Sequence, residues 1–417
     1  MNRNAPRAHA SVKAVALASI ALVLPQCSRP DAVLSLPAGA VLVVRAADPA
    51  IARQLARMFG ATPNDATTPQ LVTVRADRSV IVADAADDRC WLSATVDPAA
   101  LLAAFAGEVD RVKAMARGVL TLAMGKDGAG LADDILTIPQ QLHRMTLRIR
   151  GSPLDRNGRG TTIVAVLEPT SGSAFADFLA ALRPNDAGAP VLPGASRAAA
   201  SAQLSVALDA APASWVATSM RLVPYPAELR ATITSLSERM AHCFDGTMAV
   251  TFGSEGGGSL AAGLRDAPGM TSLMAGDDYR RVMSTAPTIG GLRAEVDFAP
   301  QAFVHRGATF TRTTSFLDET GPLLRDGKLV SSFGVAGNWM VGTYNGDDAA
   351  TRAIADTALD GGMKRVRLGD GVVLRLSLDL QSVLGAFLPH QVPGMPQGLD
   401  LTVVCTGHAL QLDIRLD

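Results

Sequence analysis

Four segments of this chain share one sequence pattern, and that pattern restricts the fold more than any other feature. Each segment opens with a run in which apolar residues alternate with others, continues with an aspartate, and closes with an amphipathic stretch. Alternation is typical of a strand, and an aspartate before an amphipathic stretch is typical of a helix N-cap. The pattern predicts strands that each lead into a short helix packed back on a sheet. The segments and their aspartates are residues 41–55 (Asp48), 90–105 (Asp97), 289–303 (Asp297) and 372–387 (Asp379).

Two roles fit these repeated aspartates: a shared carboxylate site, or helix capping. Capping explains their position in all four segments, because an Asp side chain accepts hydrogen bonds from the unpaired amide groups of the first helical turn. Pro49 and Pro98 follow two of them, and proline is favoured at the first helical position. We therefore interpret the four aspartates as caps. The same interpretation, as turn and cap residues, extends to the doublets Asp87–Asp88, Asp133–Asp134, Asp277–Asp278 and Asp347–Asp348.

Pairs of alternating segments separated by short turns predict hairpins between these units. So many strands that are neighbours along the chain predict an α+β protein, with mostly antiparallel sheets covered on one face by short helices. The predicted hairpins join residues 71–74 with 80–83, 145–150 with 161–167, 329–335 with 339–343 and 401–405 with 410–416, and the predicted helices span 173–182, 227–242 and 349–359.

The strongest internal boundary is the segment 183–201, where three prolines and a run of alanines interrupt the pattern. Strand-to-helix units on both sides of it suggest two similar lobes, as diverged copies of one architecture would give. We predict a signal peptide at residues 1–26, a tether at 27–32, an N-terminal α+β lobe at 33–190 and a C-terminal α+β lobe at 191–417.

The beginning of the chain predicts export. Residues 1–13 carry three basic groups and no acidic one, and residues 14–24 form an apolar run that is too short to span a bilayer comfortably. This arrangement is typical of a signal peptide rather than a transmembrane helix. The folded part is therefore expected to face an extracytoplasmic compartment.

Cys27 directly follows this apolar segment, and we predict that it carries a lipid. Gln26 stands where a lipoprotein signal normally has a small residue, so simple cleavage of the signal is the alternative. Ser28 in place of an aspartate favours the outer membrane of a Gram-negative cell. The predicted location is the cell envelope, on its periplasmic side.

Composition restricts the partners and the core. Removing residues 1–26 takes away three basic residues and no acidic one, which leaves a mildly acidic surface. The chain has no excess of basic residues, so nothing in its charge suggests a nucleic-acid partner. Apolar residues make up 48% of the chain but aromatic residues only 4%, so the core must consist mainly of Ala, Val and Leu, which suits close packing of helices on sheets.

Cys90, Cys243 and Cys405 are the cysteines that follow Cys27. Three thiols allow at most one disulfide, so the chain is not a disulfide scaffold in spite of its predicted oxidising compartment. Cys405 is in phase with apolar residues of a predicted strand, and we expect it to be a buried, unreactive thiol. A bridge from it to one of the other two is the alternative.

Signatures of known chemistry are incomplete in this sequence. Ser196 and Ser254 come nearest to a nucleophile elbow, but one lacks a preceding strand and the other lacks the leading glycine. The segment 155–166 begins like a calcium loop, yet it has an arginine and a valine where oxygen ligands belong. His242 and Cys243 are neighbours, and successive helical residues point about 100° apart. We expect no catalytic, metal-binding or cofactor-binding residue.

Two stretches carry a resemblance. Residues 36–44 (LPAGAVLVV) are similar to the sequence LPADALLYV, and residues 337–343 (GNWMVGT) are similar to GDWLVVGS. Asp347 and Asp348 then open a helix after the second stretch. With these motifs the chain resembles a class of uncharacterised bacterial envelope lipoproteins over most of residues 33–417. The resemblance implies strand-to-helix repeats and brings no catalytic residues.

These observations favour a non-enzymatic, exported envelope protein, a lipoprotein that binds another envelope component, either a protein or a lipid. The binding surface would be an open sheet face or a cleft between lobes. A periplasmic module for a small ligand or a lipid is an alternative, and it would contain a deep apolar cavity. A hydrolase without a recognisable motif is another, and it would bring His305 or His408 next to a carboxylate.

Overall fold

A computed structural model of the chain provides the structure. The predicted signal peptide, Cys27 and the tether lie outside the residues that the structure describes. Within the described residues, no helix is both long enough and apolar enough to cross a membrane. The described residues are 34–61, 68–85, 90–124, 137–151, 160–195, 198–207, 227–253, 256–285, 288–289, 292–293, 295–316, 327–385 and 396–417.

The chain divides into two compact units. The first contains Met1–Ala180 together with Thr406–Asp417, and the second contains Ala181–Cys405. The division falls near the predicted boundary at residue 190, but the last residues return to the first unit. They do so because their strand hydrogen-bonds along a strand of that unit, with Leu410 opposite Leu167 and Leu416 opposite Thr161.

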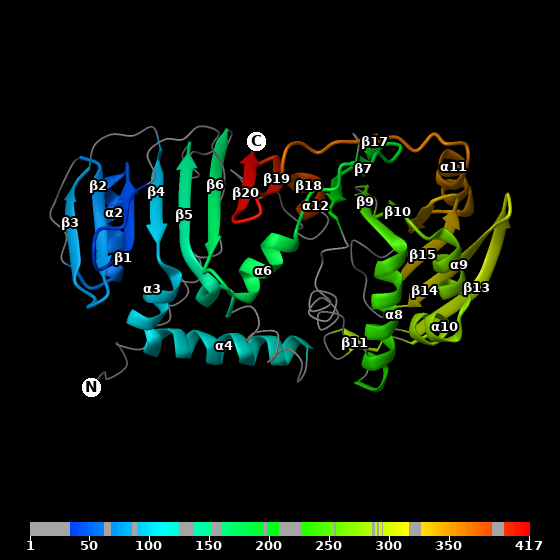
Figure 1. Ribbon diagram of the computed structural model, residues 1–417, viewed down its shortest axis with the longest axis horizontal. Coiled ribbons are helices and arrows are strands. Elements are labelled where there is room, and N and C mark those ends of the chain that lie inside the picture. The colour runs from blue at the N-terminus through cyan, green and yellow to red at the C-terminus, as the bar shows by residue number, and fades with distance from the viewer. Residues whose placement is uncertain are drawn as a thin grey trace. The chain divides into compact units, whose positions relative to one another are not determined.

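The first unit is an antiparallel sheet with helices. Its strands lie in the order β20-β6-β5-β4-β1-β2-β3 (Figure 1). Its elements are β1 (Ala40–Ala46), α2 (Pro49–Met58), β2 (Gln70–Arg75), β3 (Val80–Asp84), β4 (Leu92–Val96), α3 (Pro98–Ala104), α4 (Ala106–Met124), the 3₁₀ helix η1 (Pro139–Gln141), β5 (Leu142–Arg150), β6 (Thr161–Pro169), α6 (Ala174–Ala181) and β20 (Leu410–Leu416).

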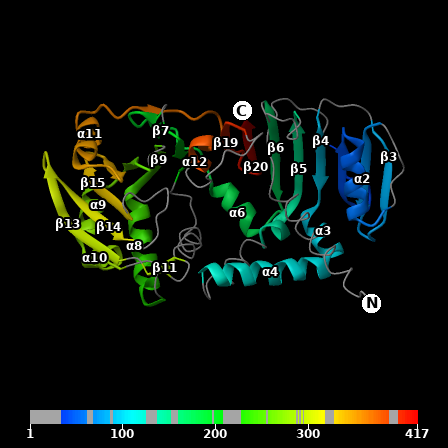
Figure 2. The same ribbon diagram turned by 180° about the vertical axis from the view of Figure 1, so that it is seen from behind.

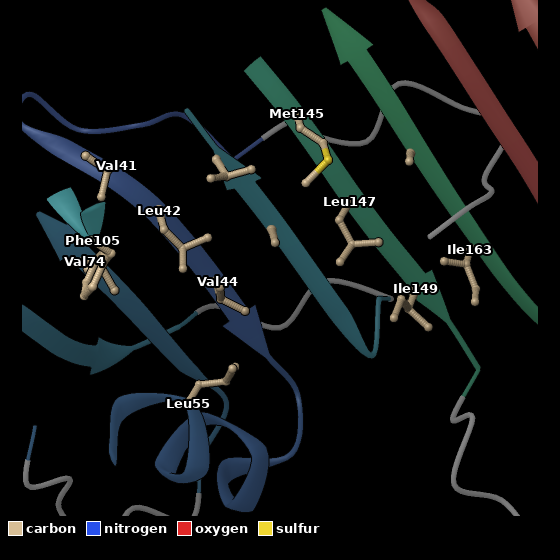
Figure 3. Close-up of a cluster of buried hydrophobic side chains, with 13 residues drawn as sticks. Val41, Leu42, Val44, Leu55, Val74, Phe105, Met145, Leu147, Ile149 and Ile163 are labelled. Atoms are coloured by element: carbon tan, nitrogen blue, oxygen red, sulfur yellow. The ribbon is translucent and has the colours of Figure 1, made fainter. Parts of the chain in front are cut away.

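One face of this sheet forms the core of the first unit. Leu42 lies opposite both Val74 and Val96 in the strand register, so the three side chains point to the same face. Leu55 of α2 and Phe105 join this buried cluster (Figure 3). α2 packs on β1 and β2. Figure 2 shows α2 in front of the sheet, between β4 and β3. Each fully buried Leu or Val side chain here stabilises the fold by about 1.5–3 kcal/mol.

The second unit contains a longer antiparallel sheet in the order β13-β14-β15-β16-β10-β9-β8-β18-β19. Its elements are β7 (Ala189–Pro190), β8 (Ala200–Ser205), the 3₁₀ helix η4 (Ala227–Leu229), α8 (Arg230–Cys243), β9 (Phe244–Phe252), β10 (Gly258–Leu264), α9 (Ala267–Ala275), α10 (Asp277–Met283), β11 (Thr288–Ile289), β12 (Leu292–Arg293), β13 (Glu295–His305), β14 (Ala308–Phe316), β15 (Lys328–Ala336), β16 (Trp339–Tyr344), α11 (Asp348–Leu359), β17 (Arg365–Val366), β18 (Val372–Asp379), α12 (Leu380–Gly385) and β19 (Gly398–Cys405).

Helices pack on both faces of this second sheet. Met340 and Val341 are neighbours on β16, so their side chains point to opposite faces. Val341 belongs to a buried cluster with Ile354 and Ala355 of α11, whereas Met340 packs against the cluster of α8, α9 and α10. The prediction of a single covered face does not hold for this unit, because its strands carry apolar side chains on both faces.

The α+β class predicted from the sequence is confirmed, with mainly antiparallel sheets and short helices. The strand pairs β2–β3, β5–β6 and β15–β16 form the hairpins that the alternating segments predicted. The helices α6, α8 and α11 occupy the three predicted helical segments. Period-two and helical patterns therefore located these elements well.

Capping by aspartate is confirmed at three of the four predicted positions. Asp48 accepts from the amide of Ala50 at 2.8 Å, and Asp97 accepts from that of Ala100 at 2.9 Å. Asp379 accepts from the amide of Ser382 at 3.0 Å. Two further caps, at Asp266 and Asp347, begin α9 and α11.

The prediction for Asp297 is wrong. Instead of capping a helix, Asp297 lies inside β13, opposite Thr314 of β14. The expected helix contains Pro300, which removes a helical hydrogen bond and clashes with the preceding turn. Pro300 is tolerated in β13 because the strand has a bulge between Ala299 and Phe303 and lies at the edge of the described sheet.

A two-stranded ribbon of β7 and β17 lies beside this sheet, with Ala189 opposite Val366. Gly188 precedes β7 with a φ of +74°, and a Cβ atom built on it would lie 2.6 Å from the carbonyl oxygen of Val366. Only glycine avoids both the left-handed strain and this backbone clash.

We predict that Gly188→Ala lowers the free energy of unfolding more than Gly361→Ala. Gly361 has a similar φ of +70° in the same unit but no atom within 4 Å of its Cβ position. Both variants lose about 1–2 kcal/mol to backbone strain, and Gly188→Ala loses about 1–3 kcal/mol more to the clash. Urea denaturation followed by circular dichroism measures the difference, and equal losses in the two variants would contradict the proposed close approach.

Candidate ligand-binding cavity

The second unit contains a cavity of about 600 Å³ between two helices and the edge of the sheet. Its size lies within the range of about 300–1,000 Å³ that is usual for small-molecule sites. Its lining residues belong to α9 and α10 on one side and to β13, β14, β15 and the turn between β13 and β14 on the other. Figure 1 shows where these helices and strands lie in the second unit. The lining residues are Thr271, Met274, Ala275, Arg280, Ala299, Pro300, Gln301, Gly307, Ala308, Thr309, Thr311 and Val335.

Burial separates these residues into a floor and a rim. The floor consists of the buried or half-buried residues Met274, Ala299, Ala308, Thr311 and Val335, of which Met274 and Thr311 are only 6% and 4% exposed. The floor is therefore mainly apolar, with one hydroxyl group. The exposed rim is more polar and consists of Thr271, Ala275, Arg280, Pro300, Gln301, Gly307 and Thr309.

Arg280 is the one ionisable side chain among the described residues that line the cavity. Its guanidinium lies 3.7 Å from the carboxylate of Asp277, and the two side chains are 56% and 99% exposed. An exposed ion pair of this kind contributes little to the stability of the fold, because water and salt screen it. The cationic group can therefore change partner at low cost.

Helical geometry places Arg280 at the rim. The preceding residue, Tyr279, is buried against Phe298 of β13, with ring centroids 6.0 Å apart. Val282 is buried on the same side of α10. Because successive helical residues point about 100° apart, anchoring Tyr279 and Val282 in the core directs Arg280 away from it.

The opposite wall is the hairpin of β13 and β14. Its two-residue turn consists of Arg306 and Gly307, both with positive φ values, 48° and 84°. Such a turn matches the twist of the paired strands. On β14 the side chains of Thr309 and Thr311 point to the face covered by α9 and α10, because Thr311 lies opposite Phe333, which packs in that layer.

The other face of this hairpin is attached to α11 by a regular series of contacts, which we call the α11 ladder. Four charged residues spaced by four along the chain lie on one side of the helix. Each contacts the hairpin or its turn: Asp348 pairs with Arg312, Arg352 lies over the Phe303 ring at 5.2 Å, Asp356 binds His305 at 2.7 Å, and Asp360 binds Arg306 at 2.8 Å.

Aromatic stacking reinforces the ladder. Phe303 of β13 stacks on Phe310 of β14, with centroids 4.7 Å apart and rings nearly parallel at 5°. Phe310 is fully buried, in the same cluster as Ile354 of α11. The strand at the sheet edge is therefore held on one face by α11 while its other face contributes to the cavity.

His305 is the histidine that the structure does bring next to a carboxylate. Its Nε2 donates to Asp356 Oδ1 at 2.7 Å, which is the beginning of a general-base arrangement. Asp356 also accepts from Arg306 at 3.1 Å. The hydrogen bond from His305, followed by that from Arg306, lowers the pKa of Asp356. With Arg306 shared between Asp356 and Asp360, we interpret the pair as part of the ladder.

The remaining candidates are scattered. His143, His242 and His408 are exposed at separate places. Ser196, Ser254 and residues 155–159 of the segment 155–166 lie outside the described residues. Across the described ranges, no three His, Cys, Asp or Glu residues are grouped closely enough to hold a metal ion.

Cys243 is buried at the end of α8, and its thiol donates to the carbonyl of Arg239. Burial, and then the charge of Asp266, raises the pKa of this thiol, so the reactive thiolate is disfavoured. Cys90 and Cys405 are also buried, and these three described cysteines form no disulfide with one another. The expectation of a buried thiol at Cys405 is confirmed.

No motif or spacing in the sequence indicated the residues of the cavity. Arg280 follows the doublet Asp277–Asp278, which lies in the first turn of α10 but does not supply its N-cap, Gly276. Thr311 is an ordinary member of an alternating strand. A small residue at a turn such as Gly307 gives a signal for the hairpin but none for a cavity beside it.

Comparison of the chain with protein-family models, with curated proteins and with solved structures finds no match in any of the three. The geometry of the described residues therefore carries the functional argument.

We predict that Asp356→Asn lowers the melting temperature at neutral pH and that this difference fades on acidification. A lowered folded-state pKa contributes stability above the unfolded pKa, close to 3.8, and the contribution is lost as the pH falls through the folded value. Thermal melts of both proteins between neutral pH and about pH 3 measure the effect. Asp370→Asn, which changes an exposed carboxylate outside the ladder, serves as the control. A difference independent of pH would contradict the ionic contact.

Proposed function

We propose that the protein is an exported, non-enzymatic protein of the bacterial cell envelope that binds a small ligand in the cavity of its second unit. One observation carries the proposal: a cavity of ligand size with an apolar floor, and a single cationic group among its described lining residues. Small-molecule sites commonly combine apolar walls with a few polar groups that orient the ligand.

The sequence suggested an envelope protein or lipid as the partner, with a small ligand as an alternative, and this proposal favours the small ligand over a protein. A cavity of this volume has room for a small molecule, whereas a protein partner needs about 800 Å² of contact surface on each side. The floor residues Met274 and Val335 come from a helix and a strand that are packed together, so their positions are set by the core. A preformed site of this kind binds without a large ordering cost.

The contacts of His305 and Arg306 with Asp356 argue against the alternative that His305 is the catalytic histidine of a hydrolase. The imidazole of His305, at the end of β13, and the guanidinium of Arg306, in the turn, both bind Asp356. Asp356 is therefore shared between two cationic or donor groups, as in a structural ion-pair network. A general base needs a nucleophile at hydrogen-bond distance in addition to its orienting carboxylate.

We predict that small ligands bind to the wild type and to Ser272→Trp but lose binding in Ala275→Trp. Both positions are exposed on α9, but Ala275 lines the cavity and Ser272 does not. An indole at Ala275 obstructs the mouth without entering the core. Ligand-observed NMR with a mixed panel of neutral, anionic and cationic compounds of about 10–20 heavy atoms measures binding to the three proteins.

The proposed function requires at least one compound whose signal is lost only in Ala275→Trp. If no compound in the panel distinguishes the two tryptophan variants, the cavity is not the binding site. Melting temperatures of the variants, measured without ligand, show whether both substitutions leave the fold intact.

For the location, we propose that Cys27 is lipidated and tethers the protein to the membrane. The basic and then apolar beginning of the sequence supports export, and Cys27 directly follows the apolar segment. A single tether of this kind leaves the folded units in the periplasm.

We predict that the full-length protein, expressed in a Gram-negative host, has an intact mass that includes diacylglycerol and an acyl chain, and that it fractionates with membranes. Cys27→Ser is expected to lose both properties, because the thiol is the attachment point. Intact-mass spectrometry and membrane fractionation provide the measurement. A mass equal to that of a simply cleaved chain, unchanged by the substitution, would show that the protein is not a lipoprotein.

A further inference from the structure

We infer that the ligand of the cavity is a monoanionic amphiphile, with a carboxylate at Arg280 and an apolar chain over the floor. This inference rests on the proposed function and specifies the chemical class of the ligand. It follows from the charge of the rim, from the composition of the floor and from the arrangement of the two.

The charge of the ligand follows from Arg280. Among the described residues around the cavity it is the one that carries a charge, and its nearest carboxylate, Asp277, is almost fully exposed and 3.7 Å away. A guanidinium binds a carboxylate with two parallel N–H···O hydrogen bonds, a geometry that Asp277 at this distance does not provide. An anionic ligand therefore gains contacts that the unliganded rim lacks.

One negative charge suits the site better than two. A single guanidinium neutralises a single charge, and the carboxylate of Asp277 beside it repels any further one. The neighbouring carboxylate of Asp278 is paired with Arg239 at 2.6 Å, which leaves Asp277 as the carboxylate that acts on the ligand. A phosphate monoester, which is largely a dianion at neutral pH, is thus a poorer match than a carboxylate.

The apolar part of the ligand follows from the floor. Met274 and Val335 present aliphatic groups, and Met side chains adapt to chains of different shape. The hydroxyl of Thr311 already donates to the carbonyl of Phe333 at 3.3 Å, so the floor has little need of a polar partner. Each ligand methylene buried here is worth about four-fold in affinity.

The arrangement gives the ligand a direction. Arg280 belongs to the exposed rim and Met274 to the buried floor, and both line the same cavity. A chain with a charge at one end can satisfy both at once. A compact anion such as acetate would contact the rim alone, and a neutral chain would contact the floor alone.

The test is isothermal titration calorimetry on the whole folded protein with four probes that share an eight-carbon chain: octanoate, octan-1-ol, octylammonium and octyl phosphate. We expect octanoate to bind at least about ten-fold more tightly than octan-1-ol and octylammonium, since a charged hydrogen-bonding pair is worth about 10- to 100-fold. We also expect it to bind more tightly than octyl phosphate, because Asp277 repels the second negative charge of the phosphate. Hexanoate is expected to bind about 16-fold more weakly than octanoate, because it lacks two methylenes.

Arg280→Gln and Arg281→Gln form a matched pair of variants. Both residues are exposed neighbours on α10, but Arg281 does not line the cavity. Octanoate affinity is expected to fall about 10- to 100-fold in Arg280→Gln and to stay within about two-fold of the wild type in Arg281→Gln. Their exposure keeps both proteins folded, and melting temperatures check this.

The inference is overturned if octylammonium or octyl phosphate binds as tightly as octanoate, or if the two glutamine variants lose affinity equally. These outcomes test the class of the ligand and not whether the cavity is a binding site. Compounds that bind the wild type but not Ala275→Trp would keep the cavity as the binding site even if octanoate fails. The absence of any such compound would refute the binding site itself.

Discussion

The α11 ladder is the interaction on which the candidate site depends. β13 lies at the edge of the described sheet, so strand pairing holds it on one side alone. The contacts of Asp356 and Asp360 with the turn, and the stacking of Phe303 on Phe310, fix the hairpin from the face opposite the cavity. Each exposed contact is weak alone. Together they restrict an edge hairpin whose movement would alter one wall of the cavity.

Coverage of both faces explains how the second unit combines a ladder with a cavity. Because neighbouring side chains on a strand alternate, β14 presents Phe310 to α11 and Thr311 to the layer of α9 and α10. Burial of Phe310 against α11 holds the hairpin in place, whereas Thr311 lies at the floor of the cavity. A sheet covered on one face alone would have to use the same face for both purposes.

Local patterns in the sequence predicted the secondary structure well and failed at one instructive place. Asp48 and Asp97 cap helices as expected, because capping involves residues two or three positions apart. Asp297 has the same surroundings, yet it lies inside β13. Pro300 was the local warning against a helix there, and the pairing of β13 with β14 was the long-range factor that decided the outcome.

The sequence by itself determined the α+β class, the positions of most strands and helices, and the capping residues, since these depend on short-range periodicity and hydrogen bonding. Tertiary structure decided that the last strand returns to β6, that helices cover both faces of the second sheet, and that Arg280 shares a cavity with Val335. These features depend on which distant segments pack together, and packing is set by the summed burial of many side chains. No spacing along the chain encodes such a contact, so the candidate site could be identified only from the folded structure.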